Sequence, residues 1–238
     1  MGSWPDPRRG TPVVVGLRQV RAGHPYDLDS AEPHVSDDDI RGGYDVPVMN
    51  GWVLLPTDEE HDGIDVDAWA EADVRSRLDH EEIADIGMSV ATLADAVDNA
   101  RAVRSGIFFA QVFHPEPTEP ILAELHTVGQ LHRDESISIE EARGLMAQPG
   151  DHYVTEPVVQ DRLLPTGPAV RSQVLMHNPQ GAVMEVVRYV IVPPGRWGWV
   201  FLAAQWTDLV LGEDLAARVD EIAVRIVIRD HFSWEEPA

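Results

Sequence analysis

The stretch RYVIVPPGRWGWVFLAAQW, residues 188–206, joins two apolar runs through a turn rich in proline and glycine, and it carries three tryptophans within ten residues. Successive side chains of a strand point to opposite faces, so one face of the second run is apolar (Trp197, Trp199, Phe201, Ala203), and so is the other (Val200, Leu202, Ala204, Trp206). A strand that is apolar on both faces belongs inside a sheet with a covering layer on each side. We therefore predict that Phe201, Leu202 and Trp206 are core residues, because large aromatic and aliphatic side chains dominate core packing.

A binding role stays open for the turn of this hairpin. Arg196, Trp197 and Trp199 lie close to it, where a ring or a guanidinium can reach a surface groove.

Apolar alternation on both sides of this hairpin predicts further strands. They fall at 46–56, 106–114, 121–128, 157–165, 169–177 and 182–192, and turn-forming proline and glycine separate the later ones. Helical spacing of apolar residues predicts helices at 65–85, at 90–103 with Ser89 as N-cap, and at the C-terminus through residue 229. A short helix at 138–148 opens with a capping box between Ser138 and Glu141.

These elements predict an α/β (α+β) fold in which helices cover a central antiparallel sheet. Connections between strands are too short for parallel crossovers, so neighbouring strands are expected to run antiparallel. Residues 1–45 mix proline, glycine and acids and are predicted to form an extension, loosely ordered or wrapped on the domain. The domain itself is expected over residues 46–232, with a tail at 233–238.

Composition limits the classes of partner. The 238-residue chain has a formal net charge of −23 and no lysine, a surface that repels nucleic acid and anionic lipid. It also has no cysteine and no long apolar run, so we expect a cytoplasmic protein that is not inserted in a membrane. Acids concentrate between Asp58 and Asp85, which indicates either a solvated helix face or a docking face for a basic partner. The acids assigned to that docking face are Asp58, Glu59, Glu60 and Asp62.

Catalytic signatures are missing from the sequence. It has no dinucleotide fingerprint, no phosphate-binding loop and no nucleophile elbow. The segment HEEIA at 80–84 lacks the second histidine of a zinc site, and the acidic segment 58–69 places Trp69 where a calcium loop needs a carboxylate. His126 shares a strand face with Glu124, which permits a weak metal or proton-transfer site. We accordingly predict no catalytic residue, no metal ligand and no cofactor.

The order of elements resembles the Mog1/PsbP-like fold, in particular the small actinobacterial members related to LpqN-type proteins. The likeness covers residues 45–230 and rests on three features: the strand at Gly51–Trp52 ahead of a proline, the hairpin around Pro193–Gly198, and the helix at 213–229. The arginine-only basic composition resembles a high-GC bacterial proteome. The resemblance implies an α/β/α sandwich around an antiparallel sheet and a family that acts by binding proteins. It supplies no catalytic residues. The sequence contains no cysteine that could be lipidated, and we expect no secretory signal in its first residues, which departs from LpqN-type lipoproteins.

Two functional hypotheses follow. The first is a non-enzymatic interaction protein whose acidic face engages a basic partner, as an accessory, chaperone or immunity-type factor of a secretion or toxin system. The alternative is an enzyme or small-ligand-binding protein with a pocket at one end of the sheet, lined by Trp197, Trp199, His126 and nearby acids. A concave cavity with convergent polar groups favours the alternative, and a filled sandwich excludes it. Self-association through an edge strand is a third possibility.

Overall fold

The structure, a computed structural model, describes residues 43–229 apart from 58–60, 62, 79–85, 104–106, 131–136 and 196–197. The strands are β1 (Gly43–Asp45), β2 (Trp52–Leu54), β3 (Ile107–Phe113), β4 (Ala123–Gln130), β5 (Val158–Leu164), β6 (Gly167–His177), β7 (Val183–Ile191), β8 (Trp199–Trp206) and β9 (Val227–Arg229). The α-helices are α1 (Val66–Arg77), α2 (Gly87–Val103), α3 (Ile139–Ala147) and α4 (Gly212–Arg225), and a 3-10 turn, η3 (Leu209–Leu211), precedes α4.

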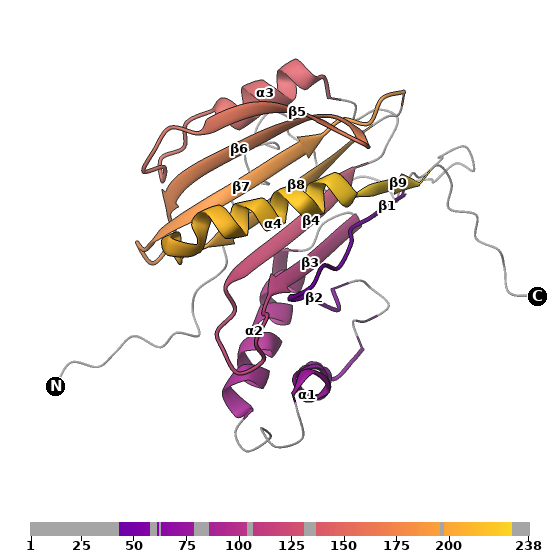
Figure 1. Ribbon diagram of the computed structural model, residues 1–238, viewed down its shortest axis with the longest axis vertical. Coiled ribbons are helices and arrows are strands. Elements are labelled where there is room, and N and C mark those ends of the chain that lie inside the picture. The colour runs from indigo at the N-terminus through magenta and orange to yellow at the C-terminus, as the bar shows by residue number, and fades with distance from the viewer. Residues whose placement is uncertain are drawn as a thin grey trace, which may run out of the picture.

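Seven strands form one sheet in the order β2-β3-β4-β8-β7-β6-β5, and every neighbouring pair is antiparallel. β8 lies between β4 and β7 near the middle of this sheet, as its two apolar faces predict (Figure 1). A smaller sheet pairs β1 with β9, in the register Tyr44 opposite Ile228. The predicted mixed α/β fold with a large antiparallel sheet is therefore confirmed.

One face of the large sheet is covered by α4 together with the β1–β9 pair (Figure 1). Leu215, Val219 and Ile222 repeat at helical spacing and are buried against Leu202 and Val187. Polar contacts hold the same helix in place. Asp220 of α4 accepts hydrogen bonds from Arg171 and from the Tyr189 hydroxyl, both at 2.8 Å.

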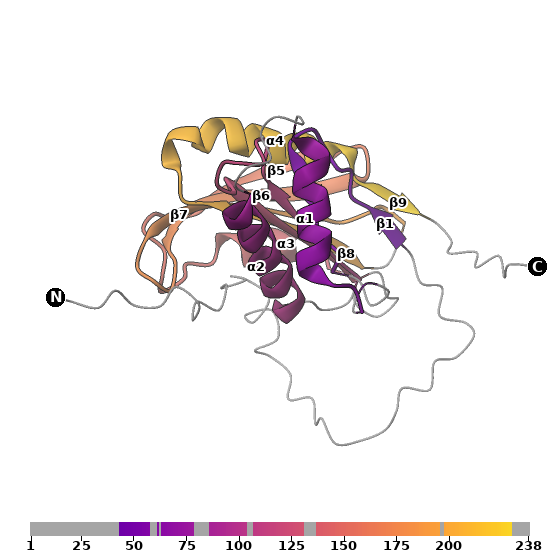
Figure 2. The same cartoon turned by 90° about the horizontal axis from the view of Figure 1, so that it is seen from below.

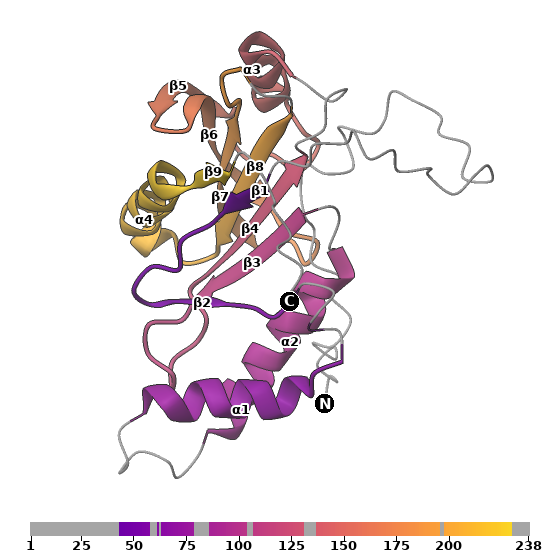
Figure 3. The same cartoon turned by 90° about the vertical axis from the view of Figure 1, so that its right-hand side faces the viewer.

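The opposite face is divided between two groups of helices. α1 and α2 lie side by side (Figure 2), and with β2 they cover Phe108, Ala110 and Val112 of β3. α3 lies farther along the sheet, where Ala142 and Met146 pack with Val170 and Val190. Figure 3 shows α4 on one side of the sheet and α2 on the other. Helices therefore cover the sheet from both sides.

The described part of β8 has the two faces that the sequence predicts. Leu202 and Trp206 are buried on the α4 face, at 0% and 3% exposure, whereas Phe201 is partly buried with the α3 cluster on the other. The predicted capping box of α3 is present in full. The Ser138 amide donates to the Glu141 carboxylate at 2.8 Å, and the Glu141 amide donates to the Ser138 hydroxyl at 3.1 Å.

Two predicted helices are longer than those in the structure. α1 ends at Arg77, since Leu78 is extended, and residues 79–85 lie outside the described part of the chain. α4 ends at Arg225, because Ile226 turns the chain into an extended conformation and β9 pairs with β1. The β-branched residues at 226–228 fit helix and strand alike, and the available strand partner decides between them.

Three other element boundaries were also wrong. α2 begins at Gly87, so Ser89 is a buried residue inside the helix and not its N-cap. The entering strand, predicted over 46–56, is limited to β2 at Trp52–Leu54. Residues 43–45, at the end of the predicted extension, form β1, while residues 1–42 lie outside the described residues.

Within the described ranges, no helix combines the length and the apolar character that crossing a membrane requires.

Candidate functional site

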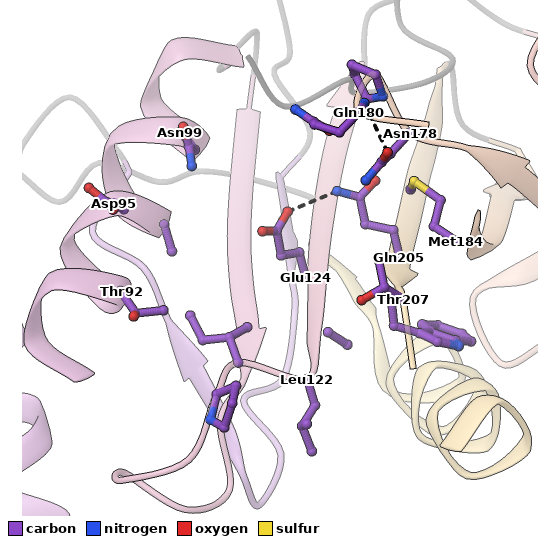
Figure 4. A pocket seen from close by; sticks show the side chains of 16 residues that line it. Thr92, Asp95, Asn99, Leu122, Glu124, Asn178, Gln180, Met184, Gln205 and Thr207 are labelled. Carbon is purple, nitrogen blue, oxygen red and sulfur yellow. Dashed lines mark hydrogen bonds between the residues drawn. The ribbon is translucent and has the colours of Figure 1, made fainter. Parts of the chain in front are cut away.

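A cleft of about 460 Å³ opens on the α2 face at one end of the large sheet (Figure 4). Its walls are α2 on one side and the β6–β7 turn with Met184 on the other; β4, β8 and the β3–β4 loop complete it. We call it the α2–β8 cleft. It is lined by Thr92, Asp95, Ala96, Asn99, Pro120, Ile121, Leu122, Ala123, Glu124, Asn178, Pro179, Gln180, Met184, Gln205, Trp206 and Thr207.

The composition of β8 explains why this end of the sheet is open. On the α2–α3 face the strand presents Trp199 and Phe201 first, and then Ala203 and Gln205. The two aromatic rings pack under α3, whereas the methyl group and the amide leave room between the helices. The change from large apolar to small and polar side chains along one strand face therefore positions the cleft.

A carboxylate and an amide form the centre of the cleft. Glu124 on β4 lies directly opposite Gln205 on β8, and Gln205 Nε2 donates a hydrogen bond of 2.9 Å to Glu124 Oε2 (Figure 4). Both side chains are half-buried. The bond fixes the orientation of the carboxylate while its other oxygen, Oε1, stays available as an acceptor.

A second carboxylate, that of Asp95, belongs to α2, which forms one wall of the cleft, and it is exposed. Neither Asp95 nor Glu124 has an ion-pair partner among the residues that the structure describes. The cleft therefore has a negative charge that its own lining does not neutralise, and it favours cationic groups.

In the wall formed by the β6–β7 turn, the Asn178 side chain hydrogen-bonds to the backbone of the turn. Asn178 Oδ1 accepts from the amides of Gln180, at 3.0 Å, and Ala182, at 2.8 Å. Because both bonds occupy this oxygen, the free strong acceptors in the cleft are the carboxylates.

Trp206 connects the cleft with the other face of the sheet. The residue borders the cleft, but its ring is buried on the α4 face, where the indole Nε1 donates to Glu185 Oε2 at 3.0 Å. Glu185 also accepts from the Gln173 amide. These bonds satisfy the buried indole N–H and hold the ring in one position.

His126 lies two residues beyond Glu124 on the same face of β4 and opposite Ala203, and it does not line the cleft. Its ring is 5.5 Å from the Phe108 ring, centroid to centroid. Burial lowers the pKa of His126, and the nearby Glu124 carboxylate partly offsets that effect. The imidazole is therefore predominantly neutral near pH 7.

Of the binding residues predicted from the sequence, the structure describes two. His126 lies next to the cleft, and Trp199 lies four residues from Ala203, among the apolar side chains under α3. The structure does not bring these two together. Arg196, Trp197, Asp58, Glu59, Glu60 and Asp62 lie outside the described residues. In the described part of the chain, no three histidine or acidic side chains are grouped so that they could hold a metal ion.

Sequence reasoning missed the residues that form the cleft, above all Gln205 and Asp95. A signal for Gln205 was present in the polar end of the β8 row that begins with Trp199. No local signal marks Asp95, because an exposed acid on an amphipathic helix is ordinary until its distant neighbours are known.

No protein-family model matches this sequence. No curated protein matches it either. Among solved structures, the chain is similar to one described as the crystal structure of LpqN, involved in cell envelope biogenesis of Mycobacterium tuberculosis. The two are 14% identical, the match covers 81% of this chain and 87% of that one, and the TM-score is 0.43. A likeness at this level carries no argument about function.

Proposed function

We propose that this protein is a non-enzymatic binding protein that receives a basic segment of a partner protein in the α2–β8 cleft. The observation that carries the proposal is the pair of carboxylates, Glu124 at the centre of the cleft and Asp95 on its α2 wall, which have no cationic partners in the described chain. The net charge of −23 adds long-range attraction for a basic partner.

Exposed acids next to lining residues in the chain add to the attraction for a basic partner. Asp98 precedes the lining residue Asn99 on α2, Glu119 precedes Pro120 in the β3–β4 loop, and both acids are exposed. The predicted docking acids at 58–62 directly precede α1 in the chain. We propose that these acids steer the partner toward the cleft and that the cleft supplies the specific contacts.

The finer assignments remain part of this proposal. They are membership of the Mog1/PsbP-like group, a cytoplasmic location, and a role as an accessory, chaperone or immunity-type factor. The seven-stranded antiparallel sheet with helices on both faces is compatible with that group.

The test compares retention of partner proteins by the immobilised full chain at about 0.1 M and about 1 M salt, where the screening lengths are about 10 Å and 3 Å. The cleft variant is Asp95→Asn with Glu124→Gln. The control is Glu140→Gln with Asp151→Asn, which makes the same charge change at exposed positions outside the cleft. We expect a partner that the wild type and the control retain at low salt, that high salt releases and that the cleft variant loses. A partner bound equally by the cleft variant, or no partner at low salt, would refute the proposal.

A small cationic ligand is a second candidate for the same cleft. A volume of about 460 Å³ lies within the usual range for small-molecule sites, and several polar groups converge there. Calorimetric titration with a panel of small amines and guanidines separates the candidates. Micromolar binding by one panel compound, lost in the cleft variant, would favour the small ligand over a protein segment.

A further inference from the structure

We infer that the group held in the α2–β8 cleft is an arginine side chain of the partner, and that an apolar residue close to that arginine packs on the η3 turn. This inference rests on the proposed function and names what the cleft recognises.

The acceptors of the cleft suit a guanidinium better than an ammonium. Gln205 holds the Glu124 carboxylate in one orientation through a bond of 2.9 Å. A carboxylate fixed in this way matches the planar fork of a guanidinium, which donates two parallel hydrogen bonds. Asp95 on the α2 wall of the cleft offers a second carboxylate. The five N–H donors of an arginine point in several directions, so they can reach more than one acceptor.

The apolar part of the lining suits the stem of the same side chain. Ile121, Leu122 and Met184 line the cleft beside the carboxylates. An arginine can bury its three methylene groups against such a surface while its head reaches an acid. Beneath them, Trp206 borders the cleft and is held in place by its hydrogen bond of 3.0 Å to Glu185, so a shift of its indole N–H signal would report binding from the far side of the sheet.

We take as the rim of the cleft the η3 turn, which begins two residues after the lining residue Thr207 and presents apolar side chains. Asp208 caps η3, since its Oδ1 accepts from the Val210 amide at 3.0 Å. In this turn Val210 is 93% exposed and Leu209 is 45% exposed. Isolated exposed apolar residues are common, but these two are adjacent and held by a capped turn. Their apolar surface contributes little to the core and is available to a partner.

Chain geometry places this rim within reach of the same ligand. Thr207 lines the cleft, and Val210 follows three residues later, so their Cα atoms are at most about 11 Å apart. That span corresponds to about one to three residues of an extended partner. The inferred recognition element is therefore an arginine with an aliphatic residue one to three positions away.

The experiment uses blocked tripeptides and NMR spectroscopy of the full chain. The reference probe is acetyl-arginyl-glycyl-leucine amide. Three analogues replace arginine with lysine, glutamine or glutamate, and a fourth replaces leucine with glycine. Titration to about 10 mM covers the weak affinity expected of such short peptides. The reporters are the Trp206 indole N–H, the Gln205 side-chain amide and the Thr207 backbone amide.

We expect the arginine peptide to shift all three signals and to bind more tightly than the lysine peptide, while the glutamine and glutamate peptides leave the signals unchanged. Glu124→Gln should weaken binding by about tenfold or more, the loss expected for one charge-assisted hydrogen bond. Glu140→Gln, the control on α3, should leave the affinity unchanged. Val210→Ser should make the leucine and glycine peptides bind with equal affinity and should leave the affinity of the glycine peptide unchanged.

The outcomes separate this inference from the proposed function. Equal binding of the lysine and arginine peptides would overturn the assignment of a guanidinium, and a leucine effect that persists in Val210→Ser would overturn the role of η3. If neutral or acidic peptides bind the cleft as well as the arginine peptide, the cleft is still a binding site, but the inference and the preference for a basic segment are both wrong. If no peptide of any charge moves the three reporters, the inference and the proposed function both fail.

Discussion

Trp206 and Glu185 are joined across two strands by a hydrogen bond of 3.0 Å, from the indole Nε1 to the carboxylate Oε2. Trp206 borders the α2–β8 cleft, and its ring is anchored beneath α4, on the opposite side of the sheet. Gly212, the first residue of α4, lies against the same carboxylate, and a Cβ built at this position would collide with it. The Trp206 indole and the start of α4 therefore share one acidic side chain.

Replacing Glu185 should destabilise the fold. Glu185→Leu leaves the Trp206 indole and the Gln173 amide without their acceptor, which should cost about 2 kcal/mol or more. Glu185→Gln keeps one side-chain oxygen and should cost less. Urea denaturation followed by tryptophan fluorescence measures both. Glu213→Gln, at an exposed position in the first turn of α4, is the control and should change stability little. Equal stability of Glu185→Leu and this control would contradict the prediction.

Gly129 should be essential for the contact between β1 and the large sheet. A Cβ at this position would collide with the Tyr44 ring, so Gly129→Ala should displace that ring and loosen the β1–β9 pair, at a cost of about 1–3 kcal/mol. Hydrogen exchange at Tyr44 and Ile228 should become faster. Gly144→Ala on α3 is the control. Its Cβ meets no atom within 4 Å, and it should stabilise the helix by about 0.5–1 kcal/mol. Unchanged exchange in Gly129→Ala would show that Tyr44 adapts without cost.

Stability should fall as the pH drops below neutrality, because of His114. Its Nδ1 accepts from Arg77 Nη2 at 3.1 Å, and its Nε2 lies 2.9 Å from the Glu119 carbonyl. Since the guanidinium only donates, the neutral ring with the proton on Nε2 fits both contacts. Burial, as the largest cause, and the nearby Arg77 lower the pKa of His114 in the folded state.

The sign of the pH effect follows from that shift. Below about pH 6.5, His114 of the unfolded chain binds a proton, whereas His114 of the folded protein stays neutral down to its lowered pKa. The free energy of unfolding therefore decreases as the pH falls from about 6.5 toward that lowered pKa. His126, with its pKa shifted in the same direction by burial, adds to the loss. Urea denaturation between about pH 8 and pH 5 measures the slope. His114→Gln should flatten it, and an unchanged slope in this variant would assign the loss to other groups.

Arg188 is a buried cation whose replacement by an apolar side chain should be tolerated. It is 5% exposed, and it donates to the Ser172 and Tyr153 hydroxyls at 3.0 Å and 2.8 Å, with no carboxylate partner in the described ranges. Its Nη2 is buried without a hydrogen bond. Arg188→Met keeps much of the volume without the buried charge and should stay within about 1 kcal/mol of the wild type. Arg188→Ala should cost about 3 kcal/mol through the cavity it leaves. A loss for methionine as large as that for alanine would show that the charge itself is needed.

The parts of the fold that local pattern determines were predictable from the sequence. The two faces of β8 follow from side-chain alternation, and the start of α3 follows from Ser138 and Glu141, which interact within one helical turn. The antiparallel pairing of β3 with β4 follows from their short connection.

Features that depend on distant partners were not predictable. The end of α4 is set by β1, about 180 residues earlier in the chain, so helical periodicity alone extended the helix too far. The cleft likewise unites α2, β4, the β6–β7 turn and β8, and no segment of the sequence contains more than part of it. The polar end of the β8 row, Gln205, was the only local indication. Whether a helix covers this end of the row cannot be told from the local sequence.

The pairing of β1 with β9 has a practical consequence for protein engineering. Because Gly43 lies opposite Arg229, the first and last residues that the structure describes meet at one corner of the sheets. A short linker between them should permit circular permutation, with new ends opened in an exposed turn such as the one at Gln180 and Gly181. Any fluorophore or affinity handle joined at either boundary would then occupy nearly the same position in space.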